Sequence, residues 1–169
     1  MSDDIFYDDL QAALESSDAD AAEVAEQEVA RRAEAHPDDA LVHYLVASAF
    51  DGAGREADAL PYYERAFALG IDRLPAQRQP EIYVQAGSTL RNLGRFDAAR
   101  DLLAEGMSGF PDYRALAVFA ALVEMSAGDA PAAAALLFRV VTMDEDASLA
   151  RFRRALRWYV DDLQRLSPA

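Results

Sequence analysis

Two histidines and four pairs of adjacent acids are the residues of this 169-residue chain best suited to chemistry. A histidine beside a carboxylate can move protons or bind zinc, and two carboxylates can divide acid and base roles. His36 precedes a proline in a predicted turn, and His43 lies on the packing face of a predicted helix, so we expect both to be structural. Adjacent acids on a helix point apart, so we expect the pairs to be solvated or to cap helices. The four pairs are Asp3/Asp4, Asp8/Asp9, Asp38/Asp39 and Asp161/Asp162.

Other reactive or ligand-binding patterns are missing from the sequence. It contains no cysteine, which excludes disulfides, thiol catalysis and thiolate metal sites. It also lacks a phosphate loop, a dinucleotide fingerprint and a nucleophile motif. The acidic run Asp144–Glu145–Asp146 lacks the glycine and the spacing of a calcium loop and is more typical of a helix start. We therefore predict that the protein is not an enzyme and has no metal or cofactor.

The charge of the chain is strongly acidic and uneven. A formal net charge of −14 repels phosphate backbones, so we predict that nucleic acid is not a partner. Residues 1–39 carry a net charge of −11, whereas residues 151–165 carry +3. Solvated helix faces, attraction between two copies of the chain, and steering of a basic partner all fit this asymmetry. The acidic start is not a signal peptide and no apolar run could span a membrane, so we expect a cytoplasmic protein without membrane binding.

A four-residue pattern that occurs three times predicts the elements that carry these side chains. Each copy is a glycine, an alanine five residues later, a bulky residue four further on, and a small or aliphatic residue three beyond that. The copies are Gly54–Ala59–Tyr63–Ala66, Gly94–Ala99–Leu103–Gly106 and Gly128–Ala133–Leu137–Val140. A period of 34 to 40 residues predicts stacked helical hairpins, with the glycine ending the first helix of each.

Small residues on both helices of each hairpin predict close packing. We expect Ala47, Gly87 and Ala121 on the first helices to face Ala59, Ala99 and Ala133 on the second. The bulky residues Tyr63, Leu103 and Leu137 would then fill the space beside each small pair.

This pattern resembles the tetratricopeptide repeat, over about residues 38–142 and best at 80–111. The chain departs from the usual pattern at His43 and Ala117, where an aromatic residue is common, and at Glu124, where an aromatic or aliphatic one is common. The chain is also similar to small bacterial tetratricopeptide proteins of unknown function. The resemblance implies an all-α, right-handed α–α superhelix with an atypical N-terminal hairpin and a C-terminal capping helix.

We expect one domain over residues 1–169. Its predicted parts are an atypical helical hairpin at 1–37, repeats at 38–71, 80–111 and 112–145, and a capping helix at 146–166. Residues 70–79 are predicted to be a loop, because they contain Pro75. Pro61 lies near the first turn of its helix, and a later start of that helix stays open.

The resemblance implies that the first helices of the repeats line a concave groove that binds a peptide or helix of a partner protein. Arg91 and Asn92 would be its polar anchors, and whether the terminal helix covers its apolar end stays open. The groove residues with assigned binding roles are Tyr44, Ser48, Asp51, Gln85, Ser88, Arg91, Asn92, Phe119 and Leu122. Further groove positions are Leu41, Glu81, Val84, Ala115, Val118 and Met125.

Two other functions stay open as hypotheses. One is a self-associating structural protein with a dimer interface at Trp158, Arg151 and Arg154, because tryptophan among arginines is typical of binding hot spots. Trp158 could instead pack against the preceding helices. The other hypothesis is a ligand-sensing domain that uses the apolar end of the groove.

Overall fold

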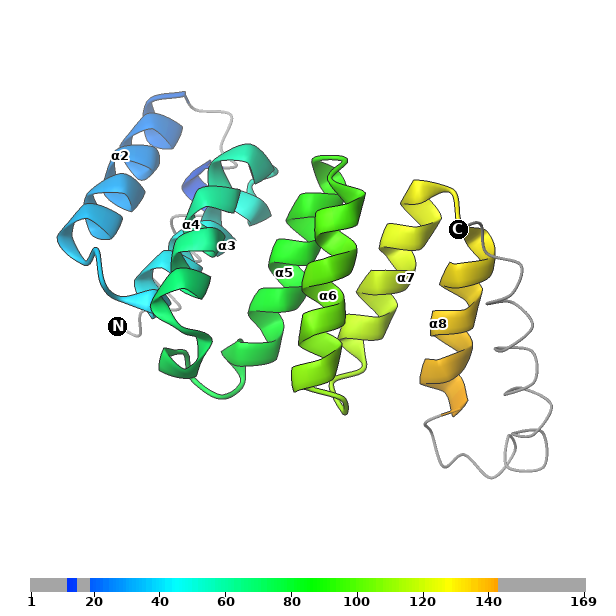
Figure 1. Ribbon diagram of the computed structural model, residues 1–169. Coiled ribbons are helices and arrows are strands. Elements are labelled where there is room, and N and C mark those ends of the chain that lie inside the picture. The colour runs from blue at the N-terminus through cyan, green and yellow to red at the C-terminus, as the bar shows by residue number, and fades with distance from the viewer. Residues whose placement is uncertain (1–11, 15–18, 143–169) are drawn as a thin grey trace. The chain divides into compact units, whose positions relative to one another are not determined.

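A computed structural model describes residues 12–14 and 19–142, and every regular element in this part of the chain is helical (Figure 1). The predicted all-α class is therefore confirmed. The chain separates into two compact units, Met1–Leu93 and Gly94–Ala169. The boundary falls inside the predicted repeat at 80–111, and the single domain stays a prediction.

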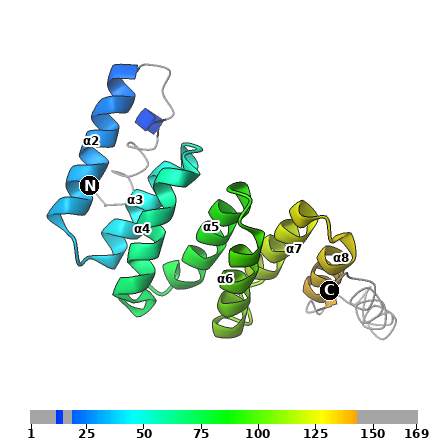
Figure 2. The ribbon, with the colours of Figure 1, turned by 45° about the horizontal axis from the view of Figure 1, so that its top comes forward.

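Each unit is built from helices joined by short turns. The first unit contains α2 (Ala19–Ala35), α3 (Ala40–Gly52), α4 (Glu56–Leu69), the short helix η1 (Ile71–Arg73) and α5 (Arg78–Asn92). The second contains α6 (Phe96–Gly109), α7 (Ala115–Ala127) and α8 (Ala130–Thr142). In the first unit α3 packs against α2, α4 and α5, and in the second α7 packs against α6 and α8. The pairs α3–α4 and α7–α8 lie side by side in both views (Figures 1 and 2).

The helix α2 confirms the predicted second helix of the N-terminal hairpin. Its apolar face is buried, with Val29 fully covered. It ends at Ala35, because His36 precedes a proline and the α conformation is disfavoured there. Arg55, in the α3–α4 turn, holds α2 in place through an ion pair of 3.0 Å between its Nη1 and Glu26 Oε2.

The boundaries of α3 follow from its terminal residues. Asp39 caps its start, where Oδ1 accepts hydrogen bonds from the backbone N–H groups of Leu41 and Val42. This bears out the capping role predicted for one of the acid pairs. Gly54 follows its end with a φ of 70°, a left-handed conformation that glycine adopts without strain.

Small side chains bring α3 and α4 together as predicted. Ala47 and Ala59 are each 0% exposed, and Tyr63 is buried to the same degree. The corresponding prediction for Leu137 is wrong, because its side chain is 44% exposed. The fully buried residues of α8 are Ala133 and Ala135, while the bulky Leu136 and Phe138 are half-buried.

The structure also shows where α4 and α5 begin. The helix α4 begins at Glu56 and contains Pro61, so the later start is wrong. Pro61 has no N–H group, so the carbonyl of Ala57 lacks its helical hydrogen bond. Ala57 is exposed, and water can supply that hydrogen bond instead. The predicted loop at 70–79 contains the short helix η1 and the start of α5 at Arg78.

We predict that Ala59→Leu destabilises the fold by about 1–3 kcal/mol, because the larger side chain would force apart two helices that meet at small residues. Urea unfolding followed by circular dichroism measures the change. Ala57→Leu adds the same side chain at an exposed position of the same helix and is the control. Equal stabilities of the two variants would contradict close packing at Ala59.

Candidate functional site

Three side-chain hydrogen bonds join α3 to α5 at successive turns of both helices. Tyr44 OH donates to Glu81 Oε2 at 3.4 Å, and Ser48 Oγ donates to Gln85 Oε1 at 2.9 Å. One turn further on, Thr89 Oγ1 donates to Asp51 Oδ1 at 2.7 Å. We call these six residues the α3–α5 ladder.

Tyr63 of α4 connects the ladder to the core. Its hydroxyl lies 3.1 Å from Gln85 Oε1 and 3.5 Å from Asp51 Oδ2. Burial of the ring, and then the nearby charge of Asp51, raise the pKa of the Tyr63 hydroxyl. It therefore stays protonated, so the ladder retains a hydrogen-bond donor at this position.

The prediction that Tyr44 faces a groove is wrong. Its side chain is 0% exposed, and its ring lies 6.4 Å from that of Tyr63. The guanidinium of Arg78 lies 5.7 Å from the centre of the Tyr44 ring. The helices α4 and α5 both pack on α3, and Tyr44 points between them rather than to the surface.

The remaining polar residues predicted to line the groove in the first unit differ in their exposure and in their existing hydrogen bonds. Ser48, Asp51 and Gln85 are half-buried and bond one another or Thr89 and Tyr63. Arg91 Nη2 donates to Asn92 Oδ1 at 2.9 Å, and Asn92 Nδ2 donates to Glu56 Oε1 at 2.9 Å. Asn92 is exposed, while Ser88 and Arg91 are half-buried.

The surroundings of Asp51 in the ladder change the pKa of its carboxyl. Burial raises the pKa of its carboxyl, and the charge of Glu56 adds to this. The hydrogen bonds from Thr89 and Tyr63 lower the pKa but do not offset the burial. The ionised carboxylate therefore carries a desolvation cost that the protonated acid lacks.

In the second unit, α7 keeps apolar side chains at the surface. Leu122 is 39% and Met125 is 58% exposed, and Val118 and Phe119 are half-buried. We call these four residues the α7 apolar face. The other side of the helix packs into the unit through its fully covered residues, which are Leu116, Ala121 and Val123. Leu122 is therefore exposed, as the sequence predicts, and Phe119 is partly so.

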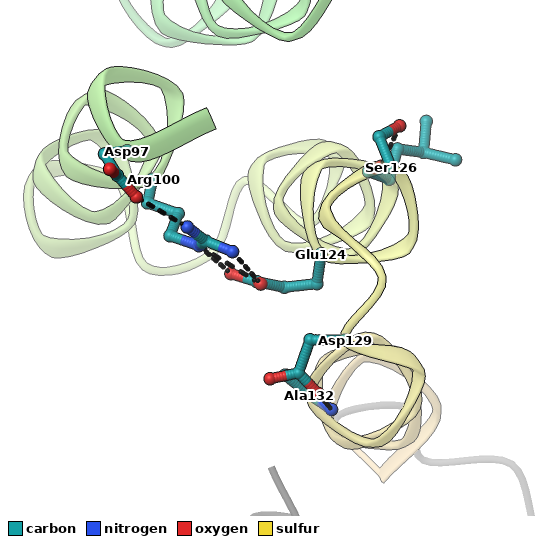
Figure 3. Close-up of polar contacts among 7 residues, drawn as sticks. Asp97, Arg100, Glu124, Ser126, Asp129 and Ala132 are labelled. Carbon is teal, nitrogen blue, oxygen red and sulfur yellow. Dashed lines mark hydrogen bonds and ion pairs between the residues drawn. The ribbon is translucent and has the colours of Figure 1, made fainter. Parts of the chain in front are cut away.

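An ion pair joins α6 to α7 (Figure 3). Arg100 Nη2 and Nε donate to Glu124 Oε2 and Oε1, each at 2.9 Å, and Nη1 donates to Asp97 Oδ1 at 2.7 Å. These groups border a polar cavity of about 530 Å³. Asp129 lies on its far side and caps α8 by accepting a hydrogen bond from the N–H of Ala132 at 2.9 Å.

The Arg100–Glu124 pair explains the departure from the repeat pattern at Glu124. The Glu124 side chain is only 14% exposed, so its carboxylate requires a hydrogen-bonding partner. Arg100 is that partner and binds the carboxylate in a bidentate manner. No role was predicted for Arg100 from the sequence. The acid Glu124 at a usually apolar position could have indicated the pair, because a buried carboxylate needs a cation on a neighbouring helix.

The two histidines have the structural placement that we predicted. His36 is exposed in the turn after α2, and His43 is buried against the ring of Tyr62. Trp158, Arg151 and Arg154, the predicted dimer interface, lie outside the described residues, so that hypothesis stays a prediction. No helix within 19–142 is long and apolar enough to cross a membrane.

Comparison with known proteins agrees with the repeat pattern. A family model described as tetratrico peptide repeat matches residues 40–163. No curated protein and no solved structure matches the chain.

We predict that Asp51→Asn flattens the dependence of folding stability on pH. With a raised pKa, folded Asp51 keeps a proton that the unfolded chain has lost, so its contribution to the unfolding free energy falls as pH rises above 3.8. Urea unfolding from acidic to neutral pH should show the variant losing less stability than the parent. Asp101→Asn, which removes a charge from an exposed site, is the control. Parallel profiles of the Asp51 variant and the parent would contradict the desolvation cost.

We predict a coupling energy of about 1–2 kcal/mol between Arg100 and Glu124, more than for an exposed pair because Glu124 is largely covered. A double-mutant cycle with Arg100→Met and Glu124→Leu, followed by urea unfolding, measures this coupling. Asp97→Asn should change stability by less than about 0.5 kcal/mol, because exposed ion pairs contribute little. The Asp97 side chain is 97% exposed. Additive effects of the two single substitutions would show that the pair is energetically irrelevant.

Proposed function

Because the chain belongs to the tetratricopeptide repeat family, we propose that it is a non-catalytic module that binds a peptide or helix of a partner protein on the α7 apolar face. Proteins of this family are generally non-catalytic scaffolds, and the family implies protein partners. The observation that carries the proposal is the exposure of Leu122 and Met125 on a helix whose other side is fully packed.

The chemistry of the α7 apolar face fits a partner that presents apolar side chains. Leu122 and Met125 are three residues apart and therefore neighbours on the helix surface. Phe119 and Val118 extend the same face by a further turn. Covering a leucine or methionine side chain contributes about 1.5–3 kcal/mol. Methionine is flexible enough to fit partners of different shape.

The α3–α5 ladder is a less suitable binding surface than the α7 apolar face, because its polar groups already bond one another. Ser48, Asp51 and Gln85 already bond within their own unit, so a partner would have to replace those hydrogen bonds to use them. An exchange of one hydrogen bond for another brings little net stabilisation. Arg91 and Asn92 retain some exposure, and we propose them as polar partner contacts of the first unit alone.

We predict that Leu122→Asp combined with Met125→Asp weakens partner binding at least about 100-fold, because each lost apolar contact corresponds to roughly tenfold in affinity. A tagged chain captures the partner from its native lysate, and titration of the recovered partner measures the affinity. Circular dichroism confirms that the variant is folded.

Val24→Asp is the control for one of the two added charges, because it places an aspartate on another exposed apolar residue, 66% exposed on α2. This control should bind the partner as the parent does. Undiminished binding by the α7 variant, or equal loss in both variants, would contradict the proposed surface.

A further inference from the structure

A cavity of about 460 Å³ opens in the first unit, where α2, α3 and α4 meet. Its lining includes Ala33 and Glu34 of α2, Pro37 of the following turn, His43 of α3, and Tyr62 and Arg65 of α4. Sites for small molecules typically measure about 300–1,000 Å³. Neither the α3–α5 ladder nor the α7 apolar face contributes to this cavity, so a ligand here would be separate from the proposed protein partner.

One wall of the cavity is aromatic and held in place. The ring of Tyr62 stacks on that of His43, with centres 6.1 Å apart, and on that of Phe50, with centres 5.8 Å apart. His43 is only 6% exposed, and its Nε2 lies 3.1 Å from the carbonyl oxygen of Pro37. Its Nδ1 is buried without a hydrogen-bond partner among the described residues. Fixed rings of this kind form a preorganised surface for an apolar group.

Arg65 lines the cavity beside this wall, and its guanidinium is held by hydrogen bonds. Its Nε and Nη2 donate to the carbonyl of Pro37 at 3.2 and 2.9 Å, and Nη2 also donates to Asp38 Oδ1 at 2.9 Å. These bonds tie the guanidinium to the turn after α2. They leave Nη1 without a partner in the described part of the chain, so it can donate to a carboxylate.

Glu34 supplies the opposite charge on the same cavity. No hydrogen bond or ion pair joins it to another described residue, and its carboxylate is not within 4.0 Å of the Arg65 nitrogens. Glu34 and Tyr62 both line the cavity, so Glu34 borders the aromatic wall. A free carboxylate and a partly free guanidinium therefore flank one apolar surface without pairing with each other.

We propose that this cavity binds a small zwitterion, an α-amino acid with an apolar side chain. The ammonium group pairs with Glu34, the carboxylate accepts hydrogen bonds from Arg65 Nη1, and the side chain packs against Ala33 and Tyr62. This arrangement uses the carboxylate of Glu34, the remaining donor of Arg65 and the aromatic wall at once. A ligand with only one of the two charges would make only one of these two charge-assisted contacts.

Isothermal titration of the full chain with L-leucine and L-phenylalanine tests the proposal. We expect at least one of them to bind. N-acetyl-L-leucine lacks the ammonium group and L-leucinamide lacks the carboxylate, so each should bind at least about tenfold more weakly than leucine if leucine binds. If phenylalanine is the ligand, N-acetyl-L-phenylalanine and L-phenylalaninamide are compared with it in the same way. Binding of neither amino acid at about 10 mM, or equal affinity for the free and blocked forms, would overturn the proposal.

Glu34→Gln provides the sharper variant, because Arg65 also holds the turn and its loss could disturb the fold. The variant should bind the amino acid about tenfold more weakly, yet bind the N-acetyl form as the parent does. Glu64→Gln removes the same charge from an exposed position of α4 outside the cavity and should change neither affinity. Unchanged amino-acid affinity in Glu34→Gln would overturn the assignment of the ammonium site.

Discussion

Close contact between helix backbones at small side chains is the constraint on which the rest of the structure depends. With Ala47 and Ala59 both fully covered, α3 and α4 are held near each other along their lengths. This position fixes Tyr63 in the core and brings its hydroxyl to Gln85 and Asp51. The polar contacts between α3 and α5 therefore follow from apolar packing between α3 and α4.

The two units use their first helices differently. In the first unit, polar side chains of α3 and α5 form hydrogen bonds with each other. Few of their donors and acceptors therefore remain for a partner. In the second unit, α7 leaves Leu122 and Met125 in contact with water. Exposed apolar area is stabilised by any partner that covers it, whereas a satisfied polar surface gains little from one. This difference favours α7 as the binding surface.

The fold was largely predictable because it depends on spacing. The glycine–alanine pattern predicted the α3–α4 and α7–α8 turns, and His43 was expected to be a packing residue. The acid pairs were expected to be solvated or to cap helices, and Asp39 caps α3. These features are local and need only the geometry of one helix or one turn.

The candidate sites were less predictable, because they depend on the rotation of one helix against another. Neighbouring positions on a helix differ by about 100° in direction, which is enough to turn Tyr44 from a groove into the core. Tyr44 and Glu81 are distant in the sequence, and only the packing of α3 on α5 brings them together. The pairing of Arg100 with Glu124 and the cavity beside Tyr62 likewise depend on how separate helices meet.

Site-specific photo-crosslinking tests the central claim, that the protein binds its partner through α7, most directly. A benzophenone amino acid placed at Leu122 reports what touches the α7 apolar face in the native lysate, and the same group at Val24 reports an exposed site on α2. We predict a covalent adduct with a second protein at position 122 and none at position 24. An adduct at position 24 alone, or at both positions equally, would contradict it.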